Sequence, residues 1–122
     1  MIDPSSFENA ALRGGFTIVH VAFAAEPLAD ALGREAIAQT GIVGRKFHLL
    51  IRSGLSDKEF SVTLYHEILE AMTVACFDPP ASVTDFNEGD FERAGYEAHE
   101  QLGAASPENL NRMLQSYGFR EG

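Results

Sequence analysis

Hydrophobic residues are densest between positions 62 and 77, where the sequence VTLYHEILEAMTVACF contains two acidic residues and one histidine. Just before it, Ser56 and Glu59 have the spacing of a helix capping box. Just after it, Asp78 is followed by two prolines, which disfavour further helix. The pattern predicts a helix over about residues 57–77. Because its apolar residues occur on all sides, we expect the helix to be buried.

Two shorter segments have the composition of β-strands. Residues 17–23 are rich in β-branched and aromatic side chains, and we interpret them as a core strand rather than a cleavable targeting segment, because the residues before them are not basic. Residues 46–52 alternate apolar and polar side chains. This alternation predicts a strand with one solvent-facing side, at a sheet edge. His48 would lie on that face, whereas His20 would be a hydrogen-bonded core or sheet-face histidine.

The remaining segments favour helices separated by glycine-rich loops. Alanine and leucine predict a helix over residues 27–39, and Gly41 and Gly44 predict a loop. A helix over residues 91–102 and a last helix beginning at Ser106-Pro107 and closed by Gly118 complete the chain. The expected fold is α+β, a single domain over residues 1–122. A small mixed sheet would pack on the buried central helix, followed by C-terminal helices.

Composition narrows the classes of partner. The formal net charge of −9 argues against nucleic acid or an anionic membrane as a partner, since both require a basic patch. The single cysteine, Cys76, excludes an internal disulfide and indicates a reducing compartment, so we expect a cytoplasmic protein. Its apolar neighbours indicate a buried, inert thiol.

The central helix also has the strongest candidate chemistry. His66 and Glu70 are four residues apart and therefore lie on one helix face, close enough to bind a common cation. Glu67 is rotated about 100° away and can lie beside that cation without binding it. A buried carboxylate without a partner is costly, so the grouping requires an explanation.

Residues 46–72 resemble the zincin metallopeptidases, in particular minimal zincin-like domains. The resemblance rests on the strand KFHLLIRS, a Leu-Ser turn and the helical sequence TLYHEILEA, whose His-Glu-x-x-Glu is similar to His-Glu-x-x-His. It implies that His66 and Glu70 are metal ligands and that Glu67 is the base that activates water. It also implies that a peptide or protein substrate lies along the strand preceding the helix.

Glu70 is where the zincin family usually has histidine, and this changes the expected metal chemistry. A carboxylate can bind zinc, but each added anionic ligand weakens the activation of water by the ion. We expect a divalent metal, with zinc favoured and Mn²⁺ or Mg²⁺ as alternatives. The function predicted is a metal-dependent, peptidase-like hydrolase. The alternatives are a non-catalytic zincin-like domain that binds metal or a partner, and a metal-free helical interaction protein.

A third metal ligand is expected from the helix over residues 91–102. Glu92, Tyr96 and His99 share one face of this helix, at i, i+4 and i+7. His99 is the first choice because imidazole is a common metal ligand, and Glu92 is the second. Tyr96 is an alternate site residue whose hydroxyl would stabilise a developing oxyanion. The other interpretation is that the acidic residues of this helix form an ordinary solvated face.

Overall fold

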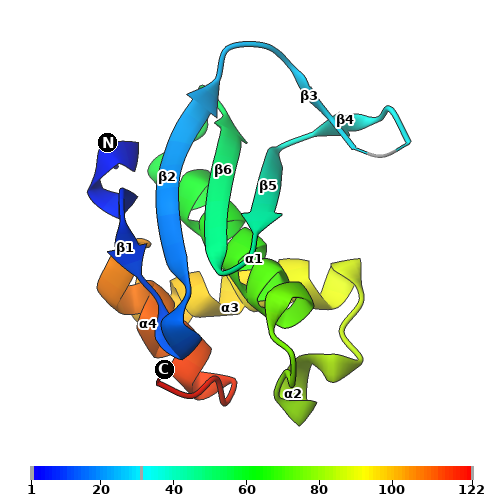
Figure 1. Cartoon of the computed structure of the whole chain (residues 1–122). Helices are drawn as coiled ribbons and strands as arrows, with labels where there is room; N and C mark the ends of the chain where they lie inside the picture. Colours follow the sequence, from blue (N-terminus) through cyan, green and yellow to red (C-terminus); the bar gives the residue numbers. More distant parts are fainter. Residues whose placement is uncertain (1, 31, 122) are drawn as a thin grey trace.

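The protein, described by a computed structural model over residues 2–30 and 32–121, contains a mixed sheet of short strands (Figure 1). Its strand order is β1 (Ala10–Ala11), β2 (Thr17–Ala24), β6 (Lys46–Arg52) and β5 (Ala38–Val43). The central pair, β2 and β6, is parallel, whereas β1 and β5 pair antiparallel with their neighbours. The two predicted strands are therefore adjacent and form the middle of the sheet.

The helical elements are η1 (Pro4–Phe7), η2 (Arg13–Gly15), α1 (Asp57–Ala75), α2 (Ala81–Thr84), α3 (Glu88–Leu102) and α4 (Pro107–Ser116). Of these, α1, α3 and α4 lie behind the sheet in the view of Figure 1. Helix α1 begins with the predicted capping box between Ser56 and Glu59, and α4 begins with Ser106 as its N-cap. The predicted α+β architecture is confirmed: a mixed four-stranded sheet packs against α1, and three further helices follow it.

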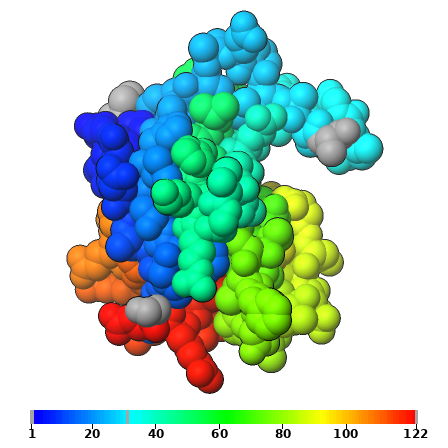
Figure 2. All heavy atoms as spheres, viewed as in Figure 1, coloured from blue at the N-terminus to red at the C-terminus, as the bar shows by residue number. Residues whose placement is uncertain are grey.

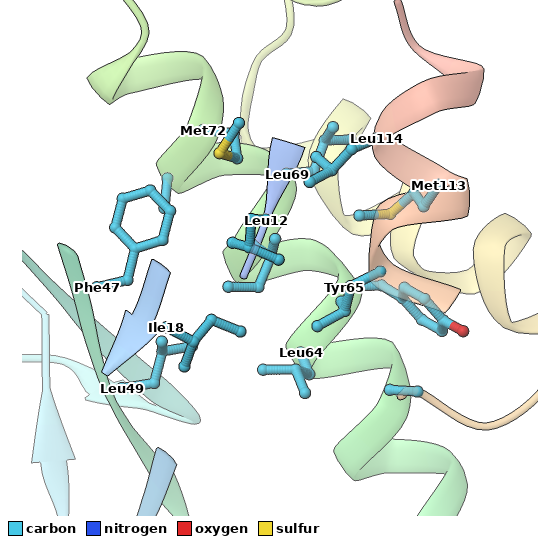
Figure 3. Packing of buried hydrophobic residues seen from close by; sticks show 14 of the residues in the cluster. Leu12, Ile18, Phe47, Leu49, Leu64, Tyr65, Leu69, Met72, Met113 and Leu114 are labelled. Carbon is cyan, nitrogen blue, oxygen red and sulfur yellow. The ribbon is translucent and has the colours of Figure 1, made fainter. Parts of the chain in front are cut away.

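The hydrophobic core lies between the sheet and α1 and extends to α4 (Figure 3). The inner face of β6 contributes its alternate residues, as the sequence pattern predicted, and they are fully buried. These residues are Phe47, Leu49 and Ile51. Helix α1 contributes side chains from both its sheet-facing and its helix-facing sides. Its burial accounts for the apolar residues that surround His66, Glu67 and Glu70 in its central turns.

The prediction of a helix over residues 27–39 is wrong. This segment forms a two-stranded hairpin, β3 (Leu28–Ala29) and β4 (Glu35–Ala36), and then enters β5. The Asp30 carboxylate accepts hydrogen bonds from the backbone N–H groups of Leu32 and Arg34, and Gly33 has a φ of 79°. Local turn chemistry of this kind competes with helix formation and here outweighs alanine and leucine propensity.

The predicted position of residues 46–52 at a sheet edge is also wrong. Strand β6 lies between β2 and β5, and β5 is the outer strand on that side. Gly41, predicted to be in a loop, lies within β5 opposite His48, whereas Gly44 does form the turn into β6. Strand β5 had no strand-like sequence pattern of its own, because three of its outer positions are glutamine, glycine and an exposed valine.

Helices α1 and α3 cross at a close contact that requires glycine. A Cβ atom built on Gly95 of α3 would lie 2.7 Å from the backbone oxygen of Val62 and 3.3 Å from Cβ of His66. The absence of a side chain at Gly95 therefore allows the two helix backbones to approach at this turn. Two hydrogen bonds hold the far end of the crossing, from the Tyr65 hydroxyl to Gly103 O and from Ala105 N to Ser61 Oγ.

Candidate metal centre

Three side chains of α1 form one group that could hold a metal ion. His66, Glu67 and Glu70 each offer a ligand atom, and these atoms all lie within 4.8 Å of one another. The Nε2 atom of His66 is 3.6 Å from Glu70 Oε2 and 4.0 Å from Glu67 Oε2. The side chains of His66 and Glu67 are only 17% and 15% exposed. The sequence predicted that these residues lie together, and the structure brings them together.

A fourth acidic side chain reaches the same place from α3. Glu88 is the first residue of α3, and its Oε1 atom lies 3.0 Å from Nε2 of His66. Glu88 was not predicted as a ligand, because the sequence pattern indicated a helix start at Phe91. The missed signal is the capping box formed by Asn87 and Asp90, which moves the helix start to Glu88 and aligns Glu88 with Glu92 and Tyr96.

The Nε2 atom of His66 is buried and accepts or donates no hydrogen bond within the described part of the chain. Three carboxylates lie within 4.0 Å of it, the nearest being that of Glu88 at 3.0 Å. Buried polar atoms in native proteins are nearly always satisfied, and an exception often marks a missing ion or water. An imidazole nitrogen facing several carboxylates is a ligand set that suits a divalent cation.

The electrostatics of the group reflect its excess of negative charge. Burial acts to lower the pKa of His66, but contact with Glu70 and the charges of Glu67 and Glu88 outweigh it and raise the pKa. The carboxyl groups of Glu70 and Glu88 interact directly. Contact with His66 lowers the pKa of Glu70, whereas burial and the proximity of Glu70 raise the pKa of Glu88. This pair therefore retains a proton more readily than two separate carboxylates, and a bound cation would replace that proton.

Glu67 has a different environment from the other carboxylates. Burial raises its pKa, and a hydrogen bond from Thr40 and the charge of His66 offset only part of this rise. The Thr40 hydroxyl of β5 donates to Oε1 of Glu67 at 2.9 Å, which leaves Oε2 facing His66. A carboxylate with a raised pKa, fixed beside a cation site, has the properties required of a general base.

These residues lie at the base of a cleft of about 1110 Å³. The cleft is bounded by α1 and α3 on one side and by β5 and the hairpin β3–β4 on the other. Figure 2 shows the hairpin, in cyan, projecting above the green and yellow surface of these helices. Glu92 and Tyr96 both line the cleft, so the predicted alternate ligands lie near the group. Its lining includes three exposed apolar side chains, Leu32, Ile37 and Val74, which are 76%, 46% and 70% exposed.

His99, the first choice for the third ligand, lies in the last turn of α3. It is eleven residues beyond Glu88, which corresponds to roughly 16 Å along a helix axis. His99 is absent from the group that His66, Glu67 and Glu70 form. Its assignment as a ligand stays a prediction, and the observed contacts favour Glu88.

Two other sequence expectations concern Cys76 and membrane spans. Cys76 is half-buried rather than buried, and it packs against the core beyond the end of α1. None of the helices in the described part of the chain combines the length and apolarity needed to cross a bilayer.

Comparisons of the chain with protein-family models, with curated proteins and with solved structures give no significant match. The resemblance to zincins therefore rests on the sequence of residues 46–72 alone, and the grouping of His66, Glu67 and Glu70 supports only that they could hold a metal ion. What the structure adds is this grouping, its burial, and the additional carboxylate of Glu88.

Proposed function

We propose that this protein is a metal-dependent hydrolase of the zincin type that acts on peptides. The observation that carries the proposal is the buried Nε2 atom of His66, which lacks a hydrogen-bond partner and faces three carboxylates within 4.0 Å. His66, Glu70 and Glu88 would hold a divalent ion, with zinc favoured. When bound, this ion would supply the Lewis acid that hydrolysis requires.

Glu67 would act as the general base. Its carboxylate would accept a proton from the attacking water and pass it to the amine that leaves when the C–N bond breaks. Thr40 supports this role because its hydrogen bond fixes one oxygen of Glu67 and leaves the other facing the cleft. The raised pKa of Glu67 makes it a stronger base than an ordinary carboxylate.

The position of β5 supports an extended peptide as the substrate. Strand β5 is at the end of the sheet order, pairs with β6 on one side, and contributes residues 38–42 to the cleft. The unpaired backbone groups of an edge strand can bind an extended chain as an added strand. The resemblance to zincins implied this role for the strand before the helix, β6. We assign it to β5 because β5 is the outer strand and β6 lies inside the sheet.

The ligand set also supports a second candidate, a metal-binding domain without catalysis. A site with one imidazole and several carboxylates lowers the effective charge of the ion and its power to activate water. Metal binding and hydrolysis must therefore be tested separately.

The first experiment measures the metal content of protein purified without added metal. About one equivalent of divalent metal is expected in the wild type, and His66→Ala should lose it. Metal-free wild-type protein that also fails to bind added Zn²⁺ or Mn²⁺ would contradict both candidates.

Glu67→Gln should retain the metal and lose cleavage of a quenched fluorescent casein. Equal hydrolysis by wild type and Glu67→Gln would exclude the catalytic role.

A further inference from the structure

The pairing of β2 with β6 contains a β-bulge that decides which way His20 faces. Ile18 is paired with Phe47, but the next pair is His20 with His48, so Val19 is an extra residue in β2. One extra residue moves the following side chains to the opposite face of the sheet. Ile18 and Val21 are consequently both buried, whereas His20 is exposed on the outer face.

The bulge therefore places two histidines side by side on neighbouring strands. The Nδ1 atoms of His20 and His48 are 3.4 Å apart, and their ring planes are inclined at 75°. In a regular strand, Val19 would lie opposite His48 and His20 would point toward the core. His48 is half-buried rather than exposed as the sequence suggested, because the ring of His20 covers part of it.

The separation of these nitrogens fits a shared metal ion. Two nitrogens bound to one tetrahedral ion, with bonds near 2.1 Å, lie about 3.4 Å apart. Bulges commonly redirect a side chain at a functional position, and this bulge directs His20 toward His48.

The outer face leaves room for an ion and its other ligands. The strands β2, β6 and β5 are uncovered on this side (Figure 2). The residue of β5 opposite His48 is Gly41, which has no side chain. Two basic residues of β6 share this face, Lys46 and Arg52, but Arg52 is held by Glu35 at 3.0 Å. Imidazole binds a metal ion in its neutral form. The histidine pair lies on the face of the sheet opposite the acidic cleft.

We propose that His20 and His48 form a second metal site, on the outer face of the sheet, for a late first-row divalent ion such as Cu²⁺, Ni²⁺ or Zn²⁺. Imidazole nitrogen binds these ions well, and Cu²⁺ most strongly. The remaining coordination positions are open to water or to a ligand from another molecule. The alternative is a simple hydrogen bond between the two rings, in which one Nδ1 donates and the other accepts.

The test is Cu²⁺ binding in a His66→Ala, Glu70→Gln background, which removes the cleft group. We expect one Cu²⁺ per chain, with an electron paramagnetic resonance spectrum that reports two nitrogen ligands. Either His20→Asn or His48→Asn should weaken binding by about a hundredfold, because joining two ligands in one site gives at least this gain.

The matched control is His99→Ala in the same background, which removes an imidazole elsewhere and should leave Cu²⁺ affinity unchanged. Circular dichroism would confirm that each variant is folded. The proposal is overturned if the background protein binds no Cu²⁺. It is also overturned if neither asparagine variant weakens binding, or if His99→Ala weakens it equally.

Discussion

The hydroxyl of Thr40 donates a hydrogen bond of 2.9 Å to the carboxylate of Glu67. This bond joins the outer strand β5 to the central helix α1, across the cleft that both elements line. Burial raises the pKa of Glu67, and the bond from Thr40 acts in the opposite direction. Thr40 therefore tunes the basicity of Glu67 as well as its orientation.

Replacing Thr40 with valine should raise the pKa of Glu67 further. Valine keeps the shape of threonine and removes the donor, so the carboxylate loses a stabilising contact with its charged form. The pKa can be followed through the carboxyl carbon resonance of Glu67 by NMR. Thr63→Val is the matched control, because Thr63 lines the same cleft without a described hydrogen bond to Glu67. An unchanged pKa in Thr40→Val would show that the bond does not act on Glu67 in solution.

The proposed third metal ligand, Glu88, can be tested by comparing Glu88→Gln with His99→Ala. Glu88 Oε1 lies 3.0 Å from His66 Nε2, so Glu88→Gln should weaken zinc binding. The loss should be at least about tenfold, since even indirect partners of a metal site have effects of this size. His99→Ala should leave the affinity near that of the wild type. Isothermal titration with Zn²⁺ measures both, and the reverse result would support the ligand predicted from sequence.

The stability of the metal-free protein should fall as pH rises through the titration of His66. Its pKa is raised above 6.5, because the surrounding carboxylates outweigh the effect of burial. The folded state therefore binds this proton more tightly than the unfolded chain. The stabilisation that this proton gives the folded state is fully present below pH 6.5. It is lost as pH rises through the folded-state pKa of His66.

Urea unfolding in the presence of a chelator, repeated across this pH range, gives the free energy of unfolding of the wild type and of His66→Gln. The difference between these two free energies should become smaller as pH rises. Zinc affinity should change in the opposite direction over the same range, because the ion binds the deprotonated imidazole. A difference that is independent of pH would contradict the raised pKa.

The close crossing of α1 and α3 makes Gly95 sensitive to substitution. A methyl group there would lie 2.7 Å from the backbone oxygen of Val62, so Gly95→Ala should force the helices apart. We expect a loss of about 1–3 kcal/mol of unfolding free energy, typical of overpacking. Zinc affinity should also fall, because displacement of α3 moves Glu88 away from His66.

The matched control for Gly95→Ala is Gly89→Ala on the same helix. The nearest atom to a Cβ at Gly89 is 3.4 Å away, on the side chain of Asn87. Alanine there should be neutral or stabilising by up to about 1 kcal/mol, because it restricts the unfolded chain. Thermal unfolding of the two variants gives the comparison. Equal stability of both would mean that the helices can separate at this crossing without cost.

Features encoded within a few neighbouring residues were predicted well. Helix α1 was predicted because Ser56 and Glu59 mark its start and apolar residues surround it. The pairing of His66 with Glu70 follows from helix geometry alone. Strands β2 and β6 were predicted because their composition is typical of strands that pack on a core.

Features that depend on distant parts of the chain were not predicted. The order of the strands placed β6 inside the sheet, and no local pattern carries that information. The contact of Thr40 with Glu67 joins residues that are 27 positions apart. The bulge at Val19 is similarly invisible in the sequence, since it is defined by the register with β6.

The hairpin β3–β4 borders the cleft, and none of its described residues belongs to the main core cluster. It lies between β2 and β5 in the chain, and its contacts with the sheet include a hydrogen bond from Gln39 to Ala29 O and an ion pair between Arg52 and Glu35. The acidic group beneath it is fixed by α1 and α3, which belong to the core. Substitutions in the hairpin can therefore alter the upper border of the cleft while the acidic group stays in place. Under the proposed function, the hairpin would influence which ligand enters the cleft, whereas α1 and α3 would determine the metal chemistry.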